Sequence, residues 1–144
     1  MKNLETAIKV SASSLFSLYL CTHFVHFNVT GPDFYQLHKL LDEIYKLLFE
    51  EFDALGEQIR TLDIYTPASL SAFQQFSEIE DMNEVQDAKT MLYELLLDFE
   101  KVIELLTVTN ELAEGHIGLQ NYLQGLVEKL GKYEWMLRAT VTGK

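Results

Sequence analysis

Apolar residues recur at steps of three and four along four long stretches of the chain, which is the period of amphipathic α-helices. No segment alternates apolar and polar residues in the way of a half-buried strand. The stretches cover roughly residues 4–29, 33–62, 83–113 and 117–140. The pattern therefore predicts an all-α fold built from four long helices.

Glycine and proline mark where these helices end. Gly31-Pro32 cannot continue the first helix, and Asp33 is a candidate cap for the second. Thr66-Pro67 is typical of a cap followed by proline at the first helical position, and it predicts a short helix reaching roughly Ser77. The fold expected is a four-helix bundle with one long crossover that contains this short helix.

The core positions of the second and third long helices follow from the same periodicity. In the second helix they are Leu37, Leu41, Ile44, Leu48, Leu55, Ile59 and Leu62. In the third, which Asp81 or Asn83 is expected to cap, they are Val85, Ala88, Leu92, Leu95, Phe99, Val102 and Leu106.

Length and composition fit one folding unit. The 144 residues, 48% of them hydrophobic, are enough for a single core, so we expect one domain over residues 1–144. Cys21 is the only cysteine, which excludes an intrachain disulfide. We expect Cys21 to act as a small buried apolar residue and the protein to reside in the reducing cytoplasm.

Residues 10–32 carry no Asp, Glu, Lys or Arg, which raises the question of a membrane span or a secretory signal. Four serines, two histidines and an asparagine interrupt this segment, so its continuous apolar part is shorter than the roughly 20 residues that a span needs. We expect a buried helix and no membrane contact.

The charge balance favours small cations as partners. The formal net charge is −11, and the eleven basic residues are scattered along the chain. Such an exterior attracts metal ions and repels phosphate backbones, so we expect no DNA binding.

One stripe of the second long helix combines imidazole and carboxylate groups, a mixture that iron accepts. With about 100° per residue and His38 at zero, Asp42, Asp53 and Glu57 fall at roughly 40°, 60° and 100°. The core positions of this helix fall near 240–300° on the same wheel. The polar stripe therefore points away from the chain's own core.

One chain cannot close this stripe around an ion. Asp42 and Asp53 lie about 16 Å apart along the axis, whereas metal–oxygen bonds are about 2 Å long. An antiparallel two-fold partner would bring His38 and Asp42 of one subunit against Asp53 and Glu57 of the other. Three aromatic residues lie on the wheel between the core positions and the polar stripe, namely Tyr45, Phe49 and Phe52. They would supply apolar contacts in that dimer. Without further information, ordinary solvated helix charges remain the alternative.

The order and spacing of these residues resemble the signature of the Dps family of mini-ferritins. The matching residues are His26-Phe27-Asn28-Val29-Thr30-Gly31, His38, Asp42 and Phe52-Asp53-Ala54-Leu55-Gly56-Glu57. The similarity is strong over residues 23–62, and it continues weakly through Gly118 and Trp135-Met136-Leu137-Arg138.

This resemblance implies a ferritin-like fold and an inter-subunit ferroxidase centre formed by His26, His38, Asp42, Asp53 and Glu57. One or two iron ions would bind there as Fe²⁺, be oxidised to Fe³⁺ by hydrogen peroxide or oxygen, and be stored as mineral in a hollow dodecamer. Such consumption of iron and peroxide protects against oxidative damage.

Several residues depart from the family pattern. Phe27 stands where the family usually has Trp, and Gln58 replaces an Arg. His116 and Asn121 stand where many relatives carry Asp near the iron entrance. His23 faces nearly the same way as His26, and we expect it to pack beside the site. We expect His116 to be a solvated histidine at a helix start. A role as a metal ligand remains the alternative for both.

Two other functions compete with this one. The first is a non-catalytic cage or nucleoid-associated protein, against which the complete ligand set and the absence of a basic tail argue. The second is a ferritin or bacterioferritin with metal inside each bundle, which would need paired Glu-x-x-His motifs facing the core. The sequence contains no such pair.

Overall fold

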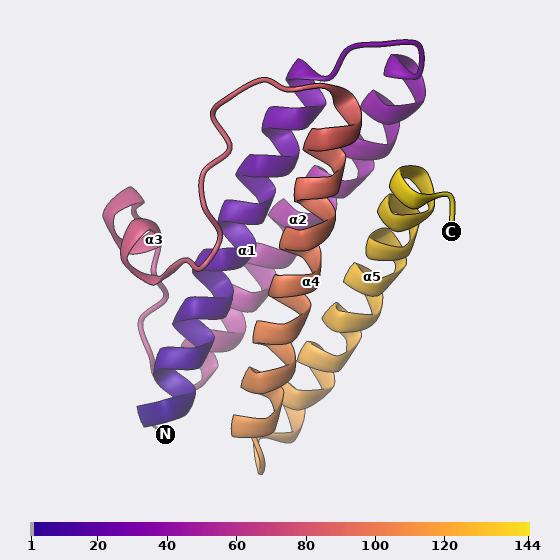
Figure 1. The fold of residues 1–144 in the computed structure, drawn as a ribbon. Coiled ribbons are helices and arrows are strands. Elements are labelled where there is room, and N and C mark those ends of the chain that lie inside the picture. The colour runs from indigo at the N-terminus through magenta and orange to yellow at the C-terminus, as the bar shows by residue number, and fades with distance from the viewer. Residues whose placement is uncertain (1) are drawn as a thin grey trace.

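The computed structural model describes residues 2–144, which form five α-helices. They are α1 Lys2–Asn28, α2 Phe34–Thr61, α3 Leu70–Phe76, α4 Ala88–Leu112 and α5 Ile117–Thr142. The chain runs up α1, down α2, back up through the long crossover, down α4 and up α5 (Figure 1). The predicted all-α four-helix bundle with a short helix in its crossover is confirmed.

The core of the bundle contains most of the apolar positions that periodicity assigned to it. On α2 the six residues Leu37, Leu41, Ile44, Leu48, Leu55 and Ile59 are buried, while Leu62 is half-buried. On α4 the residues Leu92, Leu95, Phe99, Val102 and Leu106 are buried as predicted. The polar stripe of α2 therefore faces outward, and α2 presents it on a rigid element.

α1 is long and apolar enough to cross a membrane by length and composition, but 61% of its apolar window is buried inside the bundle. Two of its serines bond to neighbouring elements: the Ser11 and Thr109 hydroxyls are hydrogen-bonded at 2.8 Å, and Ser14 Oγ accepts from the Glu78 amide at 3.0 Å. These bonds attach α1 to α4 and to the crossover. The predicted buried helix is confirmed.

The start of α4 was predicted too early. Asp87, rather than Asp81 or Asn83, caps the helix by accepting from the Thr90 amide at 2.8 Å. Val85, which was assigned to the core, lies in the crossover and is 61% exposed. The crossover has to span the bundle, and an extended segment covers about 3.3 Å per residue where a helix covers 1.5 Å.

Of two further cap predictions, the one for α3 was wrong and the one for α2 was right in position only. α3 is capped by Ser69, whose Oγ accepts from the Ala72 amide at 3.2 Å, because the Thr66 hydroxyl instead donates to the Gly56 carbonyl at 2.7 Å. Asp33 stands at the N-cap of α2, but its side chain makes no capping bond. Its φ of −99° and ψ of 17° differ from the extended geometry that directs a capping side chain to the free amides.

Candidate metal centre

Two of the predicted ligands, His26 at the end of α1 and His38 near the start of α2, stack on each other with ring centroids 3.9 Å apart. Each ring is bonded to the backbone of the other residue. His26 Nδ1 lies 3.0 Å from the His38 carbonyl, and His38 Nδ1 lies 2.9 Å from the His26 carbonyl. The pair ties the end of α1 to the start of α2. The last carbonyls of a helix have no N–H partner within that helix, and His38 supplies one to the His26 carbonyl in the last turn of α1.

These bonds fix the proton on each ring. A carbonyl oxygen only accepts, so each Nδ1 carries the hydrogen and each Nε2 keeps a free lone pair. Burial lowers the pKa of His26, which favours the neutral ring that a metal needs. Histidines held in this way through one nitrogen are prepared to ligate through the other.

Asp42 follows His38 by one turn of α2 and is already paired within that helix. Lys46 Nζ donates to Asp42 Oδ2 at 2.9 Å. The bond from Lys46 holds the pKa of Asp42 below its usual range, and the bond to Asp42 raises the pKa of Lys46. Asp42 is therefore a carboxylate that remains ionised at neutral pH.

Aromatic rings surround the histidine pair. The His23 ring is stacked between Phe27 at 4.4 Å and Tyr45 at 4.2 Å, and burial lowers its pKa. The Phe52 ring contacts Phe16 at a tilt and Phe73 edge-on within the same chain, so part of it is already used in internal packing. Phe49 remains 55% exposed.

Asp53 and Glu57 lie further along α2, and both are exposed. Within residues 3–144 neither has an ion pair, and no group of three or more His, Cys, Asp or Glu side chains could hold a metal ion. The structure thus brings together His26 and His38, places Asp42 one helical turn after His38, and leaves Asp53 and Glu57 apart. The five predicted ligands do not meet within one chain.

Two residues with polar roles were missed from the sequence. Lys46 falls at roughly 80° on the α2 wheel, inside the polar stripe, and this angle could have identified it. Glu51 falls at roughly 220°, beside the core positions, which marks it as a buried carboxylate. Its side chain is only 9% exposed and pairs with Lys129 of α5 at 2.8 Å.

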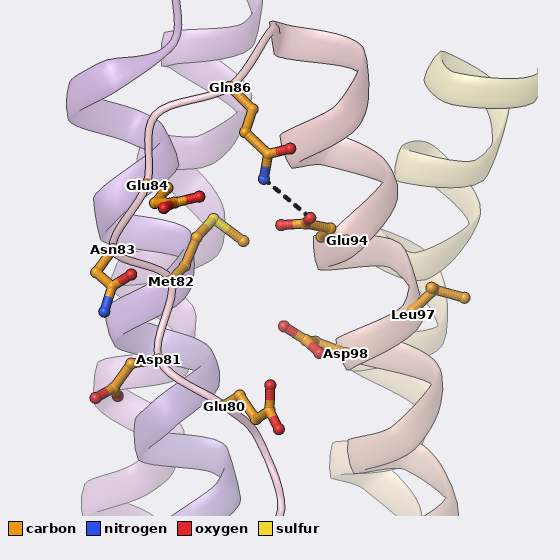
Figure 2. A pocket seen from close by; sticks show the side chains of 9 residues that line it. All are labelled: Glu80, Asp81, Met82, Asn83, Glu84, Gln86, Glu94, Leu97 and Asp98. Atoms are coloured by element: carbon orange, nitrogen blue, oxygen red, sulfur yellow. Dashed lines mark hydrogen bonds between the residues drawn. The ribbon is translucent and has the colours of Figure 1, made fainter.

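The structure also contains an acidic hollow of about 310 Å³ away from this stripe (Figure 2). Crossover residues Glu80 and Glu84 face Asp98 and Glu94 of α4 across it. Burial, together with Glu94 and Glu80, raises the pKa of Asp98 to about 6. Beneath the crossover the Cys21 thiol donates to the Glu80 carbonyl at 3.4 Å, and burial raises its pKa to about 12. Cys21 is thus buried, as predicted, and unreactive.

This chain is similar to known proteins in both its sequence and its fold. A family model for the ferritin-like domain matches residues 6–143. The DNA protection during starvation protein of Helicobacter pylori is 31% identical over 143 residues, which cover 96% of this chain and 98% of that protein.

Solved structures with the same fold are also found among these proteins. Antigen TpF1 from Treponema pallidum has a TM-score of 0.93 and 28% identity, covering 97% of this chain and 92% of its own. Dps from Vibrio cholerae O1, titled as a member of a broad superfamily of ferritin-like diiron-carboxylate proteins, has a TM-score of 0.92 and 25% identity, covering 97% and 89%. The likeness therefore extends over nearly the whole chain.

Proposed function

Because this chain belongs to the Dps proteins of the ferritin-like family, we propose that it oxidises ferrous iron at sites shared between two subunits and stores the ferric product. One observation carries the proposal: His26 and His38 are anchored through Nδ1 to each other's backbone, which leaves Nε2 free in the neutral rings. His38 is followed one turn later by Asp42 on α2, the helix that also exposes Asp53 and Glu57. The Vibrio relative's description as a diiron-carboxylate protein supports it.

In the proposed reaction His26, His38 and Asp42 of one subunit meet Asp53 and Glu57 of an antiparallel partner. Ferrous iron is the substrate, and three carboxylates with two neutral imidazoles match its ligand preference. Two ferrous ions give one electron each to hydrogen peroxide, whose oxygen–oxygen bond breaks, and two protons complete two water molecules. The carboxylates favour the ferric product because its charge is higher.

We further propose that the two-fold pairs close into a dodecamer that encloses the mineral, and that the protein works in the cytoplasm as one domain. The free, buried Cys21 thiol is in keeping with a reducing compartment. Consuming iron and peroxide together would limit oxidative damage there.

Ferric absorbance after ferrous iron and peroxide are added, combined with light scattering at neutral pH, tests the proposal. We expect fast oxidation and a particle of twelve subunits, because each half of the site is incomplete alone. Zinc-soaked crystals are expected to show metal between two subunits. A stable monomer at micromolar concentration would contradict both the shared site and the shell.

We also expect no DNA binding at physiological salt. Binding to DNA depends on Lys and Arg neutralising phosphates, whereas this chain has 11 basic and 22 acidic residues. A gel-shift assay at about 0.15 M salt, where screening acts over about 8 Å, should leave DNA free at micromolar protein. A chelator must be present, since metal ions can bridge carboxylates to phosphates. A variant extended by a lysine-rich tail is the positive control, and a band that persists with chelator for the unmodified protein would refute the expectation.

A further inference from the structure

Lys46 lies on the same stripe of α2 as the proposed ligands and pairs with one of them. Its ammonium is 2.9 Å from Asp42 Oδ2, and it lies 6.0 Å from the centroid of the Tyr45 ring. The lysine side chain is 62% exposed, and the Asp42 side chain is 35% exposed. An exposed cation thus occupies one oxygen of a proposed ligand.

The other carboxylates of the stripe differ. In the part of the chain with described side chains, residues 3–144, no lysine or arginine pairs with Asp53 or Glu57. The stripe therefore has two unlike halves. The His38–Asp42 half has Lys46 as its counter-ion, and the carboxylates of the Asp53–Glu57 half have no counter-ion. In a two-fold pair each complete site combines one half of each kind.

We propose that Lys46 is a competing cation that sets the metal affinity of the His38–Asp42 half-site. This inference rests on the proposed function. A metal ion that binds Asp42 Oδ2 has to displace the ammonium, and it then lies within a few ångströms of a positive charge. The Asp53–Glu57 half-site carries no such cost, so it fills first and the His38–Asp42 half-site fills second.

The size of the effect follows from Coulomb's law. A divalent ion and an ammonium about 5 Å apart in a water-like medium repel enough to lower affinity roughly tenfold at low salt. Salt at about 0.15 M screens over about 8 Å and reduces this factor. Removing the charge of Lys46 should therefore tighten the weaker metal step roughly tenfold at low salt, and by less at higher salt.

Calorimetric titration of the assembled protein with Zn²⁺, which has no redox chemistry, tests the proposal. For Lys46→Met we expect the weaker of two binding steps to tighten roughly tenfold at low salt. Lys46→Arg, which keeps the charge, should restore the unmodified isotherm. Lys39→Met is the matched control on the same helix, because Lys39 lies over Tyr35 and not beside Asp42. Since Lys46 is exposed, these variants should melt at temperatures close to that of the unmodified protein.

The outcomes separate this inference from the proposed function. If Asp53→Ala weakens Zn²⁺ binding but Lys46→Met leaves the isotherm unchanged, the inference about Lys46 is wrong and the site stands. Equal tightening in Lys46→Arg or Lys39→Met would also refute it. If the unmodified protein binds no Zn²⁺, or Asp53→Ala changes nothing, the proposed site fails and this inference fails with it.

Discussion

Asp53→Ala is expected to slow the oxidation of ferrous iron by peroxide at least about a hundredfold while the assembled particle persists. Loss of a group that merely supports a metal ligand typically costs 10–100-fold in affinity or activity, so loss of a ligand should cost no less. The carboxylate is the only charged group that Asp53 would contribute to the site.

The fold should tolerate this change. Asp53 is exposed and makes no ion pair within its own chain, and substitutions of that kind usually change the free energy of unfolding by less than about 0.5 kcal/mol. Glu57→Ala should behave in the same way.

His38→Ala should have a smaller effect on the rate if Asp42 and a water molecule can retain the ion.

Ferric absorbance gives the rate, and light scattering shows whether the particle is intact. Glu100→Ala, which removes an exposed carboxylate from α4, is the control for lost surface charge. A rate equal to that of the unmodified protein would show that Asp53 is not a ligand. A particle that dissociates would mean that the change acts through assembly.

Much of the fold was predictable because packing in this bundle is periodic. Each step of three or four residues on α2 returns to the same face, so core and outward positions could be separated before any contact was known. The same argument placed Asp53 and Glu57 outward, where the structure has them. It also located the end of α4, which closes at Ala113 as expected.

The errors occurred where distant parts of the chain determine the local structure. Thr66 has the sequence context of a cap, but its hydroxyl is used by Gly56 of α2. Val85 continues the heptad spacing of α4, yet the crossover has to reach the top of the bundle before the helix can begin. Neither constraint is visible in a window of neighbouring residues.

The chemistry of the site was predictable in residue type and not in detail. The reciprocal bonds of His26 and His38 depend on how the α1–α2 hairpin closes, which spacing alone does not determine. The pairing of Lys46 with Asp42 is an i,i+4 contact and lay within reach of the helical wheel. Completion of the site needs a second subunit, and one sequence does not specify how two copies dock.

Glu51→Ala is expected to lower the free energy of unfolding by about 2–3 kcal/mol, the cost of losing hydrogen bonds to a buried charged group. Glu51 Oε2 accepts from the Tyr122 hydroxyl at 2.8 Å, and Oε1 accepts from Lys129 Nζ at 2.8 Å. These bonds attach α2 to α5 in a region where the two helices otherwise touch little. The estimate stays below the about 3–5 kcal/mol of a fully buried pair, because Lys129 is 56% exposed and regains water.

Glu51→Gln separates the two bonds. The amide oxygen of Gln can still accept from Tyr122, so only the charge attraction to Lys129 is lost. Because Lys129 is exposed, this loss should lower the free energy of unfolding by less than about 1 kcal/mol. The pair also predicts a pH dependence. Pairing with Glu51 raises the pKa of Lys129. The stabilisation from this ion pair is therefore complete at neutral pH and is lost only as the pH rises through the raised pKa of Lys129.

Thermal unfolding at equal protein concentration measures both variants, since assembly makes the midpoint depend on concentration. A loss of 2–3 kcal/mol should lower the midpoint by roughly 4–12 °C in a chain of this size, and Glu51→Gln should lower it by less than about 4 °C. Glu50→Ala is the control, because it removes the neighbouring carboxylate from an exposed position on the same helix. If Glu51→Ala and Glu50→Ala melted together, Glu51 would not hold α2 to α5. If Glu51→Gln lost as much as Glu51→Ala, the charge on Glu51 and not the Tyr122 bond would be the stabilising contact.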